Sequence, residues 1–392
     1  MNPKPKLIRV TTVPVSLNIL LRGQFEFMSK QGFEVLAVSS SGPDLDEVAE
    51  REKVRTEAIE MSRKISPLKD LKSLRQMYRL FQKEKPDIVH SHTPKAGIIA
   101  MVAAKLAGVP VRLHTVAGLP LMETSGFRRK LLTAVEKMTY RCATKIYPNS
   151  KGLTQFILEN RLTAANKLKW IANGSSNGID TSHFSAGTVT EEQKTELRKI
   201  SGILADDFVF VFVGRLVGDK GINELVAAFS EICASGSNQN HTTPKLILVG
   251  DYETELDPLL PETLKEIDSN PNIFSAGYQK DVRPWFGISD CLVFPSYREG
   301  FPNVVMQAGA MGLPAVVSNI NGCNEIIADG LNGLIVPKKD TAALKKAMLA
   351  MMTDRSVYKQ LKSNARNQIV SRFEQKEVWE ALLEEYLLEI KG

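Results

Sequence analysis

The chain has 392 residues, of which 43% are apolar and 24% charged, so it can bury the cores of two ordinary domains. No apolar run reaches the roughly 20 residues that span a bilayer, and we expect no transmembrane helix. The chain runs directly into a strand-like segment, so we expect no secretory signal and a cytoplasmic location. The four cysteines lack C-x-x-C spacing, which favours reduced thiols over disulfides or a zinc site.

The net charge of +6 is unevenly distributed. Residues 1–180 contain 29 Lys or Arg against 16 Asp or Glu, whereas the rest of the chain contains 21 against 28. An ordinary solvated surface is one explanation. The alternative is a basic face on the first half that meets an anionic partner, either membrane lipid or a phosphorylated acceptor. Nucleic acid is disfavoured, because no zinc finger, helix-turn-helix or aromatic RNA-binding motif accompanies the charge.

Short apolar runs alternate with amphipathic segments along the whole chain. In the first half we predict strands at Leu7–Val13, Glu34–Ser40, Arg55–Glu60, Asp87–His92, Val111–Thr115 and Lys145–Pro148. Between them we predict helices at Leu17–Gln31, Pro67–Lys85, Pro94–Ala107 and Arg128–Cys142. The pattern restarts with strands at Asp207–Val213, Leu246–Gly250, Asn272–Ala276, Cys291–Phe294 and Ala315–Ser318. Strands rich in Val and Ile that alternate with helices indicate an α/β protein with two Rossmann-like parallel sheets in series.

The boundaries between these parts follow from composition. The polar, glycine-containing stretch Asn173–Thr190 is the expected hinge. Three helical segments close the chain, at about Ala342–Met352, Ser356–Arg372 and Glu374–Ile390. We therefore predict a first domain at 1–180, a second at 181–372, and a C-terminal helix at 373–392 that packs on the first domain.

The most informative segment covers residues 294–337. A strand end leads into a polar turn with Glu299 and Gly300, then a helix at about Phe301–Met311, the tripeptide GLP and a second buried strand. The loop of such a βαβ unit lies at the carboxyl end of the sheet, where the first unpaired N–H groups of the helix can hold a phosphate. Glu299 at that point needs hydroxyl groups from which to accept hydrogen bonds. A sugar nucleotide offers phosphates and hydroxyls together.

A second loop follows the first strand of the second half, with the sequence VGRLVGDKG at 213–221. Gly214 allows a sharp turn after the strand, and Arg215 and Lys220 lie close to the start of the next helix. Two cations in this place could bind a diphosphate and assist its departure. The alternative is a solvated loop with two ordinary cations. The segment is not a P-loop and the chain contains no G-x-G-x-x-G, so NAD chemistry is disfavoured.

Together these motifs resemble those of a known family. GRLVGDKG, EGFPNVV, GLP and DGLNGLIVP are similar to the nucleotide-sugar half of the retaining glycosyltransferases of family 4. DIVHSHTPKAGIIA, LHTVAG and NGID match that family's first half and hinge, so the resemblance covers almost the whole chain. It implies the GT-B fold, in which two Rossmann-like domains face each other across a cleft. Within the family, the sequence is most similar to bacterial enzymes that build surface polysaccharides or glycans on polyprenyl-diphosphate carriers.

The resemblance also implies a role for each matching residue. Arg215 and Lys220 would neutralise the leaving diphosphate, and Glu299 would contact the donor sugar. His114 would lie across the cleft, near the transferred sugar, although a histidine at a strand end is also commonly a packed residue. The other implied donor contacts are Gly214, Thr115, Gly300, Phe301, Pro302, Asn303 and Gln307.

Two positions depart from the family pattern. The family usually has a second glutamate eight positions after the first, where it bonds the ribose hydroxyls, and here Gln307 occupies that place. An amide still donates and accepts hydrogen bonds, but without charge assistance. The family's first strand-to-helix turn is often Gly-Gly, whereas this chain has VPVS at 13–16, which disfavours phosphate contact from that loop.

No metal and no cofactor are expected. Asp44 and Asp46 have the D-x-D spacing of metal-dependent transferases, but they follow Gly42 and Pro43, where acidic residues favour the start of a helix. The resemblance implies that cationic side chains and a helix dipole stabilise the leaving diphosphate instead.

The segment 63–85 is basic and amphipathic. Its apolar residues recur at helical spacing, which favours a stripe packed in the core, formed by Leu68, Leu71, Leu74, Met77, Tyr78 and Phe81. The alternative is a membrane-facing side that carries Lys69, Lys72, Arg75 and Arg79. A lipid-diphosphate acceptor at the inner-membrane surface would explain such a side.

We therefore predict a cytoplasmic enzyme, peripheral at the membrane, that transfers a hexose or N-acetylhexosamine from a nucleotide-diphosphate sugar to a polyprenyl-linked or oligosaccharide acceptor. The expected nucleotide is UDP, and the expected outcome is retention of the anomeric configuration. Two alternatives stay open. A sugar-nucleotide 2-epimerase shares the architecture but needs carboxylates and a histidine arranged for elimination. A sugar-nucleotide-binding protein with an impaired ribose site would explain Gln307.

Overall fold

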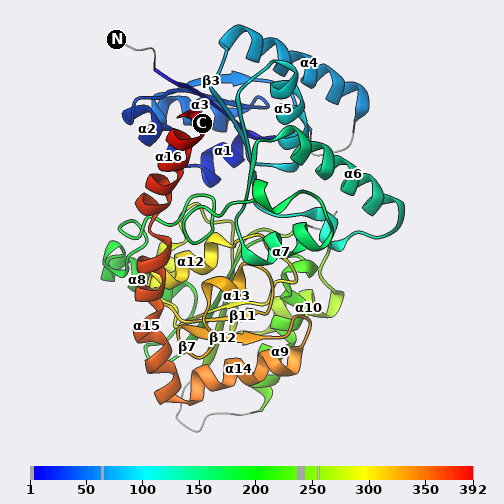
Figure 1. Cartoon of the computed structure of the whole chain (residues 1–392). Coiled ribbons are helices and arrows are strands. Elements are labelled where there is room, and N and C mark those ends of the chain that lie inside the picture. The colour runs from blue at the N-terminus through cyan, green and yellow to red at the C-terminus, as the bar shows by residue number, and fades with distance from the viewer. Residues whose placement is uncertain (1–3, 63–65, 236–242, 254, 256, 392) are drawn as a thin grey trace. The chain divides into compact units, whose positions relative to one another are not determined.

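The computed structural model describes residues 4–62, 66–235, 243–253, 255 and 257–391 (Figure 1). The contacts within the chain divide it into two compact units. The first unit comprises Met1–Gly178 together with Gln375–Gly392, and the second comprises Ile179–Glu374. The chain thus leaves the first unit and returns to it for a final helix.

The first unit is built on a six-stranded parallel sheet with the order β3-β2-β1-β4-β5-β6. Its strands are β1 (Lys6–Val10), β2 (Glu34–Ser39), β3 (Arg55–Ala58), β4 (Ile88–Ser91), β5 (Val111–Val116) and β6 (Lys145–Pro148). All six confirm predicted strands, with ends that differ by a few residues. The central strands are buried on both faces, which explains their continuous runs of branched apolar residues.

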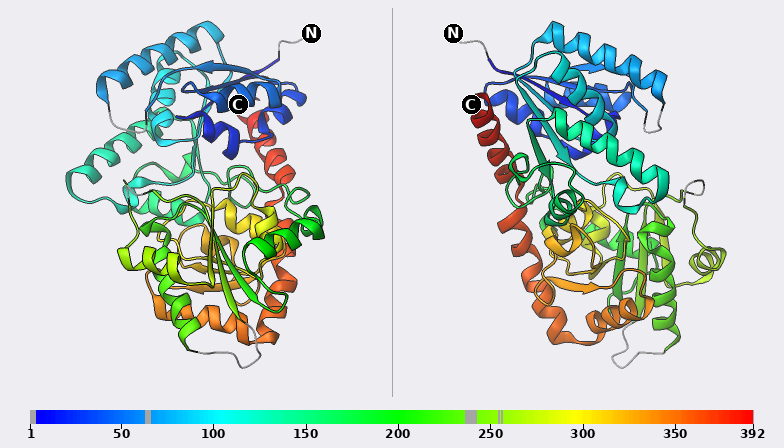
Figure 2. Two further views of the ribbon diagram at one scale, coloured as in Figure 1. Left: turned by 180° about the vertical axis from the view of Figure 1, so that it is seen from behind. Right: turned by 45° about the vertical axis from the view of Figure 1, so that its right-hand side comes forward.

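Helices cover both faces of the first sheet. They are α1 (Pro14–Leu20), α2 (Gln24–Lys30), α3 (Pro43–Glu52), α4 (Pro67–Glu84), α5 (Pro94–Leu106), α6 (Gly126–Cys142), α7 (Lys151–Glu159) and α16 (Gln375–Lys391). α5 packs between α4 and α6 on one face of the sheet (Figure 2). The other face packs against α1, α2, α3 and α16.

One predicted helix is divided into two. The segment expected to form a single helix at Leu17–Gln31 forms α1 and α2, because Gly23 between them has a φ of +84°. A side chain at Gly23 would also place its Cβ 2.5 Å from the Trp379 indole. Trp379 belongs to α16, so a residue from the far end of the chain fixes this break.

The second unit repeats the topology of the first. Its six parallel strands have the order β12-β11-β10-β7-β8-β9, which is the first sheet's order read in the opposite direction. They are β7 (Phe208–Val213), β8 (Pro244–Val249), β9 (Ile273–Gly277), β10 (Cys291–Phe294), β11 (Ala315–Ser318) and β12 (Gly333–Val336). The first five confirm predicted strands. β12 was not predicted as a strand, because four residues next to a glycine-containing turn give too short a pattern.

Helices also pack around the sheet of the second unit. They are α8 (Glu191–Ile200), α9 (Ile222–Ala234), α10 (Pro261–Ser269), α11 (Arg283–Gly287), α12 (Asn303–Ala310), α13 (Cys323–Ile326), α14 (Thr341–Thr353) and α15 (Arg355–Phe373). α14 and α15 confirm two of the three predicted closing helices, and the third forms α16.

α16 covers part of one face of the first sheet. Val378, Leu382 and Tyr386 are buried, and the Tyr386 hydroxyl lies 2.6 Å from His90 Nδ1 in a hydrogen bond. Leu387, in contrast, is 41% exposed. It follows Tyr386 directly, and consecutive residues are about 100° apart around a helix.

Candidate active site

Apart from Thr115, which lies in the first unit, the predicted donor residues lie at or just after the switch point of the second sheet. β7 and β10 are neighbours, but the chain continues from β7 to β8 on one side and from β10 to β11 on the other. After the loops at their carboxyl ends, residues 214–221 and 295–302, the chain therefore continues in opposite directions across the sheet. In open parallel sheets a ligand commonly binds between two such loops.

Two glycines shape the first of these loops. Gly214 has a φ of +151° and turns the chain directly after β7. Gly221 has a φ of +71°, and a Cβ on it would lie 2.2 Å from the Pro295 carbonyl oxygen. Any other residue at Gly221 would push the two loops apart, so the sequence pattern G-R-x-x-x-D-K-G depends on backbone contact here.

Lys220 and Glu299 form an ion pair between the two loops. Ser296 Oγ also donates to Glu299 Oε1 at 3.1 Å, and the Lys220 ammonium lies 5.7 Å from the centre of the Phe294 ring. The side chains of Lys220 and Glu299 are 16% and 17% exposed. The pair is therefore held in place by its surroundings but is still accessible from solvent, where a charged ligand can compete for it.

Arg215 is more exposed than Lys220. Its guanidinium is 2.5 Å from Glu253 Oε2, and the two side chains are 49% and 38% exposed. An ion pair so exposed contributes little to stability. The Arg215 guanidinium can therefore exchange the Glu253 carboxylate for another anion, and its contact with a diphosphate stays a prediction.

The turn before α12 is fixed from the next loop. Asn321 Nδ2 donates to the carbonyl oxygens of Glu299 at 3.1 Å and Gly300 at 2.8 Å. Gly322 has a φ of +78°, and a Cβ on it would lie 2.4 Å from the Gly300 carbonyl oxygen. Because these carbonyl groups are engaged from one side, the turn is rigid.

α12 is shorter than predicted. The expected helix at Phe301–Met311 begins at Asn303, with Pro302 as the residue before it. Phe301 lies outside the helix and packs edge-on against Phe373, with ring centres 5.4 Å apart. Gln307 lies one turn after Asn303, so the two share a helix face, and it is half-buried. Its contact with a ribose stays a prediction.

His114 and Thr115 lie in β5 of the first unit and point to opposite faces of the sheet. His114 Nδ1 is 2.8 Å from Ser91 Oγ, and a Cβ on Gly97 would lie 2.5 Å from the imidazole ring. Burial lowers the pKa of His114 to about 4, so the ring is neutral at pH 7. Thr115 Oγ1 is 2.8 Å from His90 Nε2. The contact of both residues with a sugar stays a prediction.

Asp44 and Asp46, which have the D-x-D spacing, lie in the first turn of α3. Asp44 Oδ1 accepts a hydrogen bond from Asn18 Nδ2 at 2.6 Å. Among the described residues, no group of three His, Cys, Asp or Glu side chains is arranged to hold a metal ion.

Sequence reasoning missed two residues that shape this site, Glu253 and Asn321. Glu253 follows β8, which neighbours β7, and Asn321 follows β11, which neighbours β10. Both therefore lie at the same carboxyl edge as the predicted loops. Polar residues just after each strand next to the switch point are the signal that would have found them.

Two protein-family models match the chain. Glycosyl transferase 4-like matches residues 14–150, and Glycosyl transferases group 1 matches residues 193–368. The first match lies within the first unit and the second within the second unit.

Two curated proteins are similar over most of their length. The capsular polysaccharide biosynthesis glycosyltransferase CapM of Staphylococcus aureus is 35% identical over 377 residues, which cover 96% of this chain and 95% of that protein. The UDP-Gal:alpha-D-GlcNAc-diphosphoundecaprenol alpha-1,3-galactosyltransferase of Escherichia coli is 31% identical over 355 residues, which cover 89% and 88%.

Solved structures show the same architecture. HepE of Anabaena, in complex with UDP and glucose, has a TM-score of 0.81 at 19% identity, with 98% of this chain and 100% of that chain covered. A glycosyltransferase from Rickettsia africae has a TM-score of 0.79 at 20% identity, with 100% of both chains covered. The fold is thus that of the GT-B enzymes. With these relatives and family models, the chain belongs to family 4 of the glycosyltransferases and is a glycosyltransferase.

Proposed function

We propose that this enzyme transfers a hexose or N-acetylhexosamine from a UDP-sugar to a polyprenyl-diphosphate-linked glycan, with retention, in the synthesis of a bacterial surface polysaccharide. The names of two relatives support the acceptor class: CapM acts in capsular polysaccharide biosynthesis, and the E. coli enzyme acts on a diphosphoundecaprenol-linked sugar. UDP-Gal in that second name and the UDP bound to HepE support the nucleotide.

The observation that carries the proposal is the pair of cations at the switch point of the second sheet. Arg215 and Lys220 both leave the loop after β7, and both contact carboxylates that solvent can reach. A diphosphate that replaced these carboxylates would gain charge-assisted hydrogen bonds from two cations. Backbone N–H groups at the start of α12 would add donors on the other side of the same site.

The chemistry then rests on stabilising the leaving group. The bond from the anomeric carbon to the diphosphate oxygen breaks, and the acceptor hydroxyl oxygen bonds to the same face of that carbon. The hydroxyl proton passes to the departing diphosphate, so atoms and charge balance without a protein nucleophile or cofactor. Arg215 and Lys220 act where negative charge grows, and Glu299 accepts hydrogen bonds from the sugar hydroxyls.

The test is a donor screen followed by transfer. Nucleotide sugars are first compared by the thermal shift that each produces, and the active donor is then supplied with a prenyl-diphosphate-linked glycan. We expect a product with retained configuration and unchanged yield after divalent ions are chelated. Turnover of the donor without an acceptor would instead indicate an epimerase. Binding without any transfer would indicate a sugar-nucleotide-binding protein.

We further propose that the enzyme is peripheral at the cytoplasmic face of the membrane, with α4 at the lipid surface. The apolar stripe of α4 was expected to pack in the core, with a membrane-facing side as the alternative, and Leu68 is 86% exposed and Leu71 63%. Only later residues of the helix, such as Met77 and Phe81, are buried. Exposed cations accompany the two leucines at Lys69, Lys72, Arg75 and Arg79. Exposed apolar residues among cations are typical of a helix at a lipid surface.

α6 carries a second surface of this kind. Phe127 is 82% exposed and Met138 50%, and exposed cations lie beside them at Arg128, Lys130, Lys137 and Arg141. α4 and α6 flank α5 on the same face of the first sheet. No helix in the described ranges is long and apolar enough to span a bilayer. The two helices would therefore bind the surface of an anionic membrane.

Sedimentation with lipid vesicles tests the membrane surface. We expect the bound fraction to rise with anionic lipid content and to fall when Leu68 and Leu71 are both replaced by Ser. Leu204→Ser is the matched control, because Leu204 lies in the second unit and is 71% exposed. Binding that does not respond to anionic lipid content would remove this part of the proposal.

A further inference from the structure

Lys220 has to exchange its carboxylate partner in the proposed reaction. Its ammonium pairs with Glu299, and this pair joins the loop after β7 to the loop after β10. When a diphosphate takes the place of Glu299, that link between the two loops is lost. The backbone that carries Lys220 therefore needs other contacts, because a misplacement of about 1 Å can slow an enzyme by about 10²-fold.

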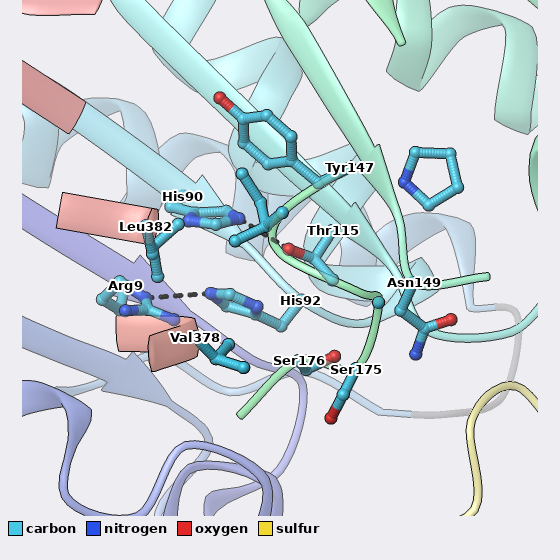
Figure 3. A pocket seen from close by; sticks show the side chains of 13 residues that line it. Arg9, His90, His92, Thr115, Tyr147, Asn149, Ser175, Ser176, Val378 and Leu382 are labelled. Carbon is cyan, nitrogen blue, oxygen red and sulfur yellow. Dashed lines mark hydrogen bonds between the residues drawn. The ribbon is translucent and has the colours of Figure 1, made fainter. Parts of the chain in front are cut away.

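The switch point of the first sheet holds its cation by direct contacts to the charged group. Arg9 is fully buried, and its Nε donates to His92 Nε2 at 2.9 Å (Figure 3). Its Nη2 donates to Gln24 Oε1 at 2.8 Å. Lys220 cannot be held in this way, because its ammonium has to stay available to a ligand. Its position has to be fixed through the backbone instead.

Asp257 binds the backbone of the turn that carries Lys220. This turn is the short 3-10 helix η4 (Gly218–Lys220), and Asp257 follows β8, the strand next to β7. Asp257 Oδ2 accepts from the N–H of Asp219 at 2.5 Å, and the Asp257 carbonyl oxygen accepts from the N–H of Gly218 at 3.2 Å. The first N–H groups of a helical turn have no acceptor within it, so Asp257 caps η4 from another loop.

Gly218 allows this close contact. A Cβ at Gly218 would lie 2.9 Å from Asp257 Oδ1, which is closer than an ordinary van der Waals contact. Gly218 does not have a positive φ, so a glycine is not required here by the backbone conformation. Its role is to let the Asp257 carboxylate reach the buried start of the turn.

The same turn is also held from the loop after β10. The N–H of Tyr297 donates to the carbonyl oxygen of Asp219 at 2.8 Å. The Arg298 guanidinium donates to Asp219 Oδ2 through Nε at 3.0 Å and through Nη2 at 2.7 Å. Asp219 directly precedes Lys220, and Arg298 directly precedes Glu299. A second link therefore joins the two loops, and it does not depend on the partner of Lys220.

We propose that Asp257 is a positioning residue for Lys220, with the pair of Asp219 and Arg298 as a second support. This role rests on the function proposed for the enzyme. Asp257 holds the backbone of η4, so that only the lysine side chain has to move when a diphosphate replaces Glu299. The ammonium is then already in place where negative charge grows on the leaving group.

Transfer kinetics of Asp257→Ala test this role. We expect kcat to fall about tenfold and the KM for the donor to rise by less, because the charge on the leaving oxygen is largest in the transition state. Asp257→Asn should recover most of the rate, since its side-chain oxygen still accepts from the N–H of Asp219. A larger effect on KM than on kcat would indicate direct contact of Asp257 with the donor and would contradict the proposal.

A comparison without the Lys220 ammonium separates positioning from other roles. If Asp257 acts through Lys220, its loss should matter little once that lysine is replaced. Lys220→Ala combined with Asp257→Ala should therefore transfer sugar within about twofold of the rate of Lys220→Ala alone. A further tenfold loss in the double variant would show an independent role and overturn the proposal.

Gly218→Ala disturbs the same contact while it keeps both side chains. The added Cβ would displace the Asp257 carboxylate, so transfer should slow as it does in Asp257→Ala. This variant decides the matter if Asp257→Ala does not fold. A normal rate in Gly218→Ala would then contradict the proposal.

Arginine variants compare the second support with a matched control. Arg298→Gln should lower kcat by less than Asp257→Ala, because the Arg298 side chain is 50% exposed. Arg283→Gln should leave the rate unchanged, since Arg283 forms a similar pair with Asp281, at 2.9 and 2.7 Å, within a single segment of the second unit. Equal losses in the two variants would mean that the pair of Asp219 and Arg298 has no particular role.

A crystal structure of the unaltered protein with UDP tests the placement without any transfer. We expect the Lys220 ammonium on the diphosphate, with the N–H groups of Gly218 and Asp219 still bound to Asp257. A turn that leaves Asp257 when UDP binds would contradict the proposal. An unaltered protein that transfers no sugar would contradict the proposed function instead, so the two failures are distinguishable.

Discussion

The two sheets have the same strand order, but the charged and polar residues at their switch points differ in solvent exposure. In the first unit, Arg9, His90 and His92 are buried, and burial lowers the pKa of both histidines. In the second unit, Lys220 and Glu299 form an ion pair that stays partly exposed. Topology therefore decides where polar residues gather, whereas solvent exposure decides whether they can exchange partners with a ligand.

The largest expected effect concerns the packing of α16 in the first unit. Leu382→Ala removes a buried side chain of α16 and should lower the free energy of unfolding by about 2–5 kcal/mol. Leu388→Ala in the same helix is the control, because Leu388 is 60% exposed and its loss should change stability by less than about 0.5 kcal/mol. Urea unfolding measures both. Equal effects would mean that α16 does not pack as described.

The partly exposed site of the second unit is tested by replacing its two cations. Lys220→Ala and Arg215→Ala should each lower the transfer rate by on the order of 10²-fold, because each removes a charge that stabilises the leaving diphosphate. Lys345→Ala is a matched control, since Lys345 in α14 also pairs with a glutamate, Glu231, at 2.9 Å. Turnover numbers measured at saturating donor would decide. Near-normal rates in either variant would remove that residue from the mechanism.

Low pH should destabilise the first unit, because its buried histidines are neutral in the folded state. The folded-state pKa of His114 is about 4, below the ordinary value of 6.5, so only the unfolded chain takes up a proton as the pH falls below 6.5. Stability should decline between pH 6.5 and about 4, by roughly 2 kcal/mol at pH 5 for this residue.

A neighbouring carboxyl works in the opposite direction. Burial raises the pKa of Glu136 to about 7, so its proton uptake on folding adds stability as the pH falls from 7 towards 4.5. The contribution of His114 is therefore measured as a difference between the unaltered protein and His114→Asn, with urea midpoints at pH 7.5 and pH 5. Identical pH slopes for the two proteins would show that His114 is not the cause.

The smallest expected effect concerns Gln307 on the exposed side. Gln307→Glu should tighten UDP binding by about fivefold if this residue meets the ribose, because a charged acceptor forms a stronger hydrogen bond than an amide. Calorimetric titration with UDP measures the change. Unchanged affinity would place the ribose away from Gln307.

The sequence predicted most of the sheets because their information is local. β7 reads FVFVFV, and no other element explains six consecutive apolar residues so well. β12 was not predicted, because the four residues Gly333–Val336 are too few to form a recognisable strand pattern. The break between α1 and α2 was not predicted either, because it depends on Trp379, which is distant in the sequence.

The candidate site residues of the second unit were easier to predict from the sequence than those of the first unit. Arg215, Lys220 and Glu299 lie in loops with distinctive glycines, so their neighbourhood was visible in the sequence. Arg9 was not singled out in the sequence, because its surroundings depend on His92 and on residues of α16. Contacts between residues so distant in sequence leave no local pattern.

The route of the chain has a consequence for its synthesis. The second unit is one continuous stretch, Ile179–Glu374, whereas the first needs residues from both sides of it. On the ribosome, the second unit can therefore complete its fold while the first still waits for Leu382 and Tyr386. During that interval the part of the sheet face that α16 covers is exposed, and a nascent chain stalled there would be a target for chaperones.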